Sequence, residues 1–144
     1  MSYLCSKMSK TTQIILRFYL RRYPLTLSVI AVVLCLSLMP IPEVKHLRNI
    51  PLMDKWTHMV MYGTLTLVLW LELRRAHPSC GMGRLLLAFF GPIALGGTLE
   101  LAQAYLTTYR SGEWLDFVAN TIGVCLGAVV AWTVVRLFPK WFRR

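Results

Sequence analysis

The chain has 144 residues, of which 56% are hydrophobic and only 15% are charged, and its mean hydropathy is +0.55. This composition is poorly matched to a soluble globular domain of that size and predicts an integral membrane protein. The net charge of +10 does not indicate nucleic-acid binding, because the basic residues form short clusters between apolar stretches instead of one continuous patch.

The chain begins with a basic segment, residues 1–23. Within it, residues 11–22 (TTQIILRFYLRR) have the pattern of an amphipathic helix that lies on the cytoplasmic surface of a membrane. An apolar stretch follows at residues 24–39. A cleaved signal peptide is an alternative explanation of this stretch. No small-residue cleavage site follows it, however, so we favour a retained anchor.

Four apolar stretches are long enough, or nearly so, to cross a hydrocarbon layer that needs about 20 helical residues. They cover residues 24–39, 58–73, 85–106 and 117–138. The first two are short, but flanking residues such as Tyr23 and Lys55 can extend them into the interface. The sequence therefore predicts an all-α membrane protein with four transmembrane helices in residues 24–138, followed by a basic cytoplasmic tail at residues 139–144.

The distribution of charge predicts the orientation of these helices. If both termini are cytoplasmic, twelve of the sixteen basic residues lie on the cytoplasmic side, as the positive-inside rule requires. Five of the six acids then fall on or near the outer side, namely Glu43, Asp54, Glu100, Glu113 and Asp116. We therefore expect a multi-pass protein with its N- and C-termini inside.

Polar side chains of the last three predicted helices gather at this outer side. Asp54 and His58 are four residues apart and therefore share one helix face. Glu100 lies about six residues, or ~9 Å, below the outer end of its helix, while His58 and Asn120 lie one turn deep. The third and fourth helices carry stripes of the same spacing, which consist of Gly96, Glu100, Gln103 and Thr107, and of Asp116, Asn120, Gly123, Gly127 and Ala131.

Several of these residues also have a purely structural explanation. Gly123 and Gly127 form a small-xxx-small stripe, which predicts close packing of two helices. Asp54, Lys55 and Asp116 stand at helix starts, where capping and the helix dipole explain them as well as a binding site does.

Glu100 is harder to explain by packing alone. A carboxylate within an apolar span costs on the order of 2.5 to 3.5 kcal/mol, so it must face a partner or a water-filled cavity. Acid, base and amide groups at one depth are better explained by a shared site than by independent packing accidents. Tyr62 lies about 80° around the helix from His58 and is predicted to pack instead of joining this site.

These residues together resemble the VanZ-like family of small bacterial membrane proteins. The pattern consists of Asp-Lys-x-x-His, Glu-x-x-Gln, a loop Arg, and Asp-x-x-x-Asn-x-x-Gly-x-x-x-Gly, and the resemblance covers about residues 25–138. In this chain the matching residues are Asp54, Lys55 and His58; Glu100 and Gln103; Arg110; and Asp116, Asn120, Gly123 and Gly127. A proline often found between the Gln and the Arg is missing from QAYLTTYR. The resemblance implies a cell-envelope protein of the bacterial cytoplasmic membrane, in a family whose namesake is associated with teicoplanin resistance.

The residues leave two function classes open. In the first, the outer cavity binds the anionic head of an envelope lipid or lipid-linked precursor, with Arg110 and Lys55 as cations and Glu100 and His58 orienting it or exchanging protons. Asp54, Gln103, Asp116 and Asn120 complete the predicted ligand-binding set. In the second, His58 is the general base of an enzyme, steered by Asp54 or Glu100, that acts on a lipid or peptidoglycan precursor. A packing subunit without chemistry is a third, simpler explanation.

Neither a metal nor a cofactor is predicted. The cysteines, Cys5, Cys35, Cys80 and Cys125, form no CxxC pair, and we assign them neither disulfides nor metal ligation. A metal site built from His58, Glu100 and Asp116 is an alternative, but a single histidine argues against it. The expected partners are membrane lipids and a lipid-linked envelope precursor, and a homo-oligomer formed through a small-residue stripe is compatible with so thin a core.

Overall fold

The computed structural model describes residues 10–39, 52–106 and 113–142, and within these ranges all regular structure is helical. The elements are α2 (Lys10–Arg22), α3 (Pro24–Leu38), α4 (Met53–Ala76), α5 (Met82–Leu106), α6 (Trp114–Leu137) and the short 3-10 helix η2 (Pro139–Phe142). The predicted all-α architecture is therefore confirmed for the part of the chain that the structure describes.

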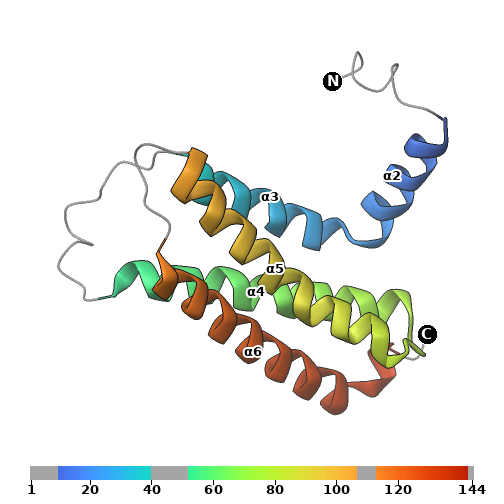
Figure 1. Cartoon of the computed structure of the whole chain (residues 1–144). Coiled ribbons are helices and arrows are strands. Elements are labelled where there is room, and N and C mark those ends of the chain that lie inside the picture. Colours follow the sequence, from blue (N-terminus) through green and yellow to red (C-terminus); the bar gives the residue numbers. More distant parts are fainter. Residues whose placement is uncertain (1–9, 40–51, 107–112, 143–144) are drawn as a thin grey trace.

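Helices α3 to α6 run up and down in alternation and form one bundle (Figure 1). Helix α4 is central, since it contacts α3, α5 and α6. Helix α2 projects away from the bundle, and the chain bends by 97° between α2 and α3 at Tyr23 (Figure 1). Consequently the start of α4, the end of α5 and the start of α6 lie at the same end of the bundle.

Two of the described helices, α5 and α6, are each long and apolar enough to cross a membrane. Helices α2 and α3 would add a third candidate only if this sharply bent pair formed one span. Helix α4 has 24 residues, but His58 and Glu72 interrupt its apolar run. The four predicted spans and their orientation therefore stay predictions.

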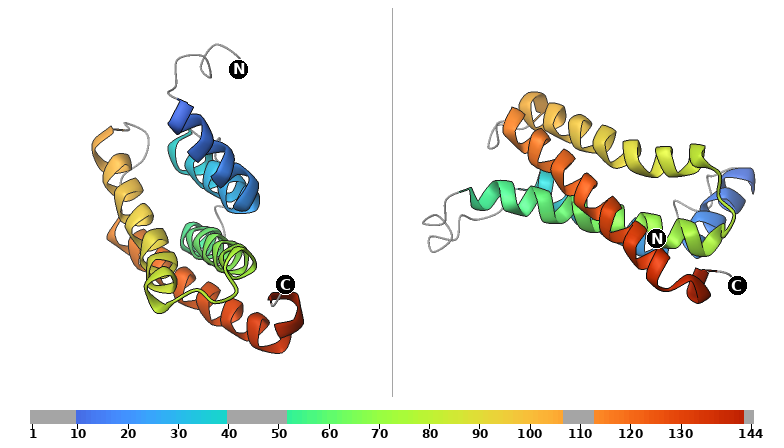
Figure 2. Two further views of the ribbon diagram at one scale, coloured as in Figure 1. Left: turned by 90° about the vertical axis from the view of Figure 1, so that its right-hand side faces the viewer. Right: turned by 90° about the horizontal axis from the view of Figure 1, so that it is seen from below.

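Helices α4 and α6 pack backbone against backbone, and Figure 2 shows α6 crossing α4 obliquely. A Cβ atom on Gly123 would collide with the backbone carbonyl of Met59, and one on Gly127 would collide with that of Gly63. Any larger side chain would push the helices apart, which is the packing role expected of such stripes. This close contact fixes the position of α6 against α4.

The apolar core lies in the middle of the bundle and draws on all four of its helices. Its buried members are Val33 of α3, Tyr62 and Leu65 of α4, Leu99 of α5 and Val124 of α6. Tyr62 is thus a core residue, which agrees with its predicted packing role. The charged side chains described on these helices lie toward the two ends, whereas the buried side chain of Thr66 lies in the middle of α4.

Candidate functional site

The start of α4, the second half of α5 and the start of α6 bring six ionisable or amide side chains together, which we call the polar cluster. Its members are Asp54, Lys55, His58, Glu100, Asp116 and Asn120. All six are residues that the sequence predicted for the site. The cluster lies beside the α4–α6 contact, at the left-hand end of the bundle in Figure 1.

Lys55 neutralises part of the acidic charge in this cluster. Its Nζ atom lies 2.5 Å from Asp116 Oδ1, 2.5 Å from Glu113 Oε2 and 3.6 Å from Asp54 Oδ2. Asp116 is buried, whereas the Asp54 and Glu113 side chains are half exposed. The Lys55–Asp116 contact is therefore the shielded part of the network, and it joins α4 to α6.

His58 lies at the centre of the cluster, and its side chain is only 2% exposed. Its Nδ1 atom lies 3.1 Å from Asn120 Oδ1, and its Nε2 atom faces Asp116 Oδ2 at 3.6 Å and Asp54 Oδ1 at 3.9 Å. Asn120 is fully buried and donates its amide N–H to Glu100. Because the Asn120 oxygen can only accept, His58 Nδ1 is the donor in this contact, and Nε2 is the ring nitrogen that faces the two aspartates.

Glu100 is held loosely. It accepts long hydrogen bonds from the Glu113 backbone N–H at 3.3 Å and from Asn120 Nδ2 at 3.4 Å, and it lies 3.8 Å from His58 Nδ1. Gly96, one turn earlier on α5, leaves room for Asn120, since a Cβ there would stand 3.1 Å from Asn120 Nδ2. With respect to the described residues, the carboxylate thus retains hydrogen-bonding capacity for a further partner.

A groove of about 340 Å³ opens beside Glu100 between α5 and α6. Its walls are mainly apolar, and two carboxylates stand in its lining. The lining residues are Gly97, Glu100, Leu101, Ala104, Glu113, Trp114 and Phe117. The groove therefore connects the polar cluster to the outer surface of the helix pair.

One predicted site residue, Gln103, is bonded elsewhere among the described residues. Gln103 donates its amide to the backbone carbonyl of Ser37 at 2.8 Å, which ties α5 to the end of α3. Arg110 lies outside the described residues. Glu113, in contrast, was not predicted for the site, although it pairs with Lys55 and bonds to Glu100. Its position three residues before Asp116, at a helix start, was the available signal.

A second polar feature lies at the opposite end of the bundle, and the sequence analysis missed it. Glu72 of α4 accepts hydrogen bonds from Leu25 N at 3.0 Å, Thr26 N at 2.9 Å and Thr26 Oγ1 at 2.7 Å, at the start of α3. A carboxylate there satisfies free amides and favours the positive end of the helix dipole. Nothing in the local pattern of α4 reveals which helix start Glu72 will meet.

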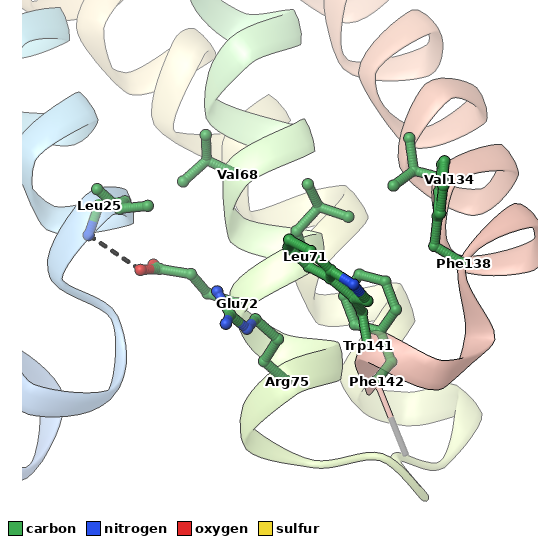
Figure 3. Close-up of a pocket in the computed structure, with 9 residues that line it drawn as sticks. All are labelled: Leu25, Val68, Leu71, Glu72, Arg75, Val134, Phe138, Trp141 and Phe142. Atoms are coloured by element: carbon green, nitrogen blue, oxygen red, sulfur yellow. Dashed lines mark hydrogen bonds between the residues drawn. The ribbon is translucent and has the colours of Figure 1, made fainter. Parts of the chain in front are cut away.

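An apolar hollow of about 370 Å³ adjoins Glu72 (Figure 3). Figure 3 shows Leu71, Trp141 and Phe142 crowding its lower part, with the Leu25–Glu72 hydrogen bond at its edge. Since Glu72 is already saturated by α3, this hollow offers apolar contact and little polar chemistry. The polar cluster is therefore the stronger candidate for a functional site.

Comparison of the chain with protein-family models, with curated proteins and with solved structures gave no match. The function is therefore argued from the geometry of the polar cluster and the groove.

Proposed function

We propose that this is a multi-pass membrane protein that binds the headgroup of an envelope lipid or lipid-linked precursor at the polar cluster. In this proposal α3 to α6 cross the membrane with both termini in the cytoplasm, and the cluster lies at the outer face. The observation that carries the proposal is the convergence of buried ionisable groups from three helices beside an apolar groove. Intramembrane ionisable residues usually mark functional pathways because they are costly to bury.

The groove supports a ligand with both an apolar and a polar part. Leu101, Trp114 and Phe117 offer an apolar wall for an acyl or polyprenyl chain, while Glu100 and Glu113 offer hydrogen-bond acceptors to a headgroup. Lipid-linked precursors combine such a chain with hydroxyl-bearing sugars. The VanZ-like motifs add the expectation of an envelope ligand and of an influence on teicoplanin-type susceptibility.

The anionic part of such a headgroup needs a cation. Lys55 was predicted to provide one, but its ammonium already contacts the carboxylates of Glu113 and Asp116. Within the described residues the cluster is therefore rich in acceptors, so hydroxyl or amine groups of the ligand are the favoured contacts of Glu100 and Glu113.

A second candidate function is acid–base catalysis by His58. The observation in its favour is the fixed imidazole, whose Nδ1 bonds to Asn120 while Nε2 faces two aspartates. A general base must come within hydrogen-bond reach of its substrate, yet the His58 side chain is buried. Binding is therefore the function that this geometry supports better.

Filling the groove tests the binding proposal. In Gly97→Leu, the new side chain would enter the groove beside Phe117, whereas Gly91→Leu places the same side chain in open space on the same helix. We expect Gly97→Leu to lower the binding of radiolabelled polyprenyl-linked precursor by about tenfold, a loss of ~1.4 kcal/mol. Gly91→Leu should bind like the parent. Equal binding by all three proteins would remove the groove from the proposal, and a new covalent product would favour the enzyme.

The orientation of the protein in the membrane can be tested with single cysteines placed at opposite ends of the bundle. In a variant whose four native cysteines are replaced by alanine, Glu113→Cys should react with an impermeant maleimide in intact cells, because Glu113 is exposed near the cluster. Lys140→Cys, in the exposed part of η2, should react only after lysis. The reverse pattern would place the cluster on the cytoplasmic side.

A further inference from the structure

The oxygen and nitrogen atoms around His58 have the arrangement of an incomplete coordination shell. One ligand atom each from Asp54, His58 and Asp116 lie within 4.8 Å of one another. We propose that these three residues bind one divalent transition-metal ion such as Zn²⁺. This site goes beyond the lipid-binding proposal and replaces the sequence-based expectation of no metal.

The distances favour a shared ion over direct hydrogen bonds. His58 Nε2 lies 3.6 Å from Asp116 Oδ2 and 3.9 Å from Asp54 Oδ1, beyond the range of about 2.7–3.2 Å for a good hydrogen bond. Ligands at about 2.0–2.2 Å from one Zn²⁺ stand roughly 3.4 Å apart in tetrahedral geometry. Asp54 is half exposed, and a rotation of its side chain would bring its oxygen closer to the other two ligand atoms.

The hydrogen bond on the other side of the imidazole points to the same conclusion. His58 Nδ1 donates to Asn120 Oδ1 at 3.1 Å, so Nε2 is the ring nitrogen that faces the two carboxylate oxygens. When Nε2 is unprotonated, three acceptor atoms converge there, and a cation between them would remove their mutual repulsion. Histidines that bind metals characteristically donate their second N–H to a fixed oxygen acceptor, the role that Asn120 has here.

Lys55 orients the aspartates without occupying this position. It contacts Asp54 through Oδ2 and Asp116 through Oδ1, whereas the other oxygen of each carboxylate, Oδ1 and Oδ2 respectively, faces His58. Each aspartate thus offers one oxygen to the ammonium and one to the ion. Glu100 lies on the Nδ1 side of His58, at 3.8 Å, and so is not a ligand in this arrangement.

Three protein ligands leave an open position on a tetrahedral ion. Lys55 already contacts two carboxylates and so is not available to a headgroup phosphate. A metal ion bound at this position would provide the positive charge for that phosphate. This last step rests on the proposed lipid binding, whereas the metal site itself does not. The two ideas can therefore fail separately.

Metal binding is tested on the full chain, purified in detergent and stripped with a chelator. We expect the parent protein to take up one equivalent of Zn²⁺ in competition with a chromophoric chelator. His58→Ala and Asp116→Asn should abolish this uptake. Asn120→Ala should weaken it about 10- to 100-fold, the usual effect of losing the group that orients a metal-binding histidine.

A matched control separates the loss of a ligand from the loss of any histidine. His77→Ala removes a histidine at the opposite end of α4. This variant should bind Zn²⁺ like the parent. A parent that takes up no Zn²⁺, or a His58→Ala protein that binds as tightly as the parent, would overturn the proposal.

Two further measurements keep the outcome clear. If His58→Ala fails to fold, the absorption spectrum of Co²⁺ bound to the parent decides, because intense visible bands report a tetrahedral site and their absence contradicts it.

Binding of polyprenyl-linked precursor to the stripped and the Zn²⁺-loaded parent tests the link to lipid. Lipid binding without any metal uptake refutes only the metal site, whereas metal uptake without lipid binding refutes only the proposed function.

Discussion

The two ends of the bundle each bury one glutamate, and the two carboxylates are held very differently. Glu72 accepts three hydrogen bonds of 2.7–3.0 Å from the start of α3. Glu100 is equally buried, yet the hydrogen bonds that it accepts from the described residues are 3.3 and 3.4 Å long, and it lies beside an open groove. Residue type and burial alone therefore do not determine how firmly a carboxylate is held. Among the described residues, the length of the hydrogen bonds separates Glu72, which is tied to α3, from Glu100, which lies beside the groove.

The charge around each end shows the same contrast. The end that contains Glu72 carries arginines from three helices, Arg22, Arg75 and Arg136 among them. The end that contains Glu100 is acidic, with Lys55 shared between Glu113 and Asp116. A basic end suits the cytoplasmic face of a membrane, whereas a buried acidic end suits a site for a cation or for hydrogen-bond donors.

The largest loss of stability is expected at the close contact between α4 and α6. Gly123→Leu places a side chain against the backbone carbonyl of Met59 and forces α4 and α6 apart. We expect a loss of about 3 kcal/mol, the upper end of the overpacking range, in detergent unfolding experiments. Gly91→Leu, which meets open space, should change stability by less than about 0.5 kcal/mol. Similar losses in both variants would contradict the close α4–α6 contact.

Glu72→Gln should give the next largest loss of stability. The new amide keeps one acceptor oxygen but turns an N–H₂ group toward the donors of Leu25 and Thr26, and it removes a charge that favours the α3 dipole. We expect the unfolding free energy to fall by about 2 kcal/mol. Thr26→Val, which removes only the hydroxyl donor, is the control and should cost about 1 kcal/mol. If Glu72→Gln left the unfolding free energy unchanged, Glu72 would not stabilise the start of α3, and the contrast with Glu100 would be wrong.

Glu100→Gln should affect function more than stability. Its hydrogen bonds to Glu113 and Asn120 are long, and neutralising a buried carboxylate removes a desolvation cost. We expect stability to change by less than about 1 kcal/mol, while precursor binding falls by about tenfold. Thermal unfolding and equilibrium binding of the same preparation measure both quantities. A loss of stability as large as that of Glu72→Gln would make Glu100 a structural acid as well.

The smallest loss of stability is expected at Arg22, an exposed residue at the end of the bundle that contains Glu72. Arg22 donates to the backbone carbonyl of Ala76 at 3.3 Å in an exposed position. Arg22→Ala should therefore change the unfolding free energy by less than about 0.5 kcal/mol. A loss comparable to that of Glu72→Gln would show that surface arginines, and not the capped start of α3, hold this end together.

The helices were predictable because long apolar runs are a strong signal. The predicted stretches at residues 85–106 and 117–138 correspond closely to α5 (Met82–Leu106) and α6 (Trp114–Leu137). Helix α4 begins five residues before its apolar stretch, because its first turn contains Asp54, Lys55 and Trp56. Hydropathy marks the part of a helix that suits a membrane, and the helix itself continues into polar sequence.

The members of the polar cluster were predictable from spacing, but their pairings were not. Helical periodicity shows that Asp54 and His58 share a face, since the backbone fixes the angle between them. It says nothing about how α4, α5 and α6 rotate against one another. That rotation brings Glu113 to Lys55 and directs Gln103 to Ser37 of α3.

Composition, charge and periodicity thus predicted the helices that the described residues form, and they placed Asp54, Glu100 and Asp116 toward one end of the bundle. These properties follow from local sequence, because apolar runs favour helices and the helical repeat sets which residues share a face. Only the tertiary structure decided that Glu72 caps α3, that Glu100 accepts long hydrogen bonds from the described residues, and that His58 turns Nε2 toward two aspartates. Those outcomes depend on how closely and at what rotation the helices pack, which the glycines of α6 govern through contacts with a distant segment.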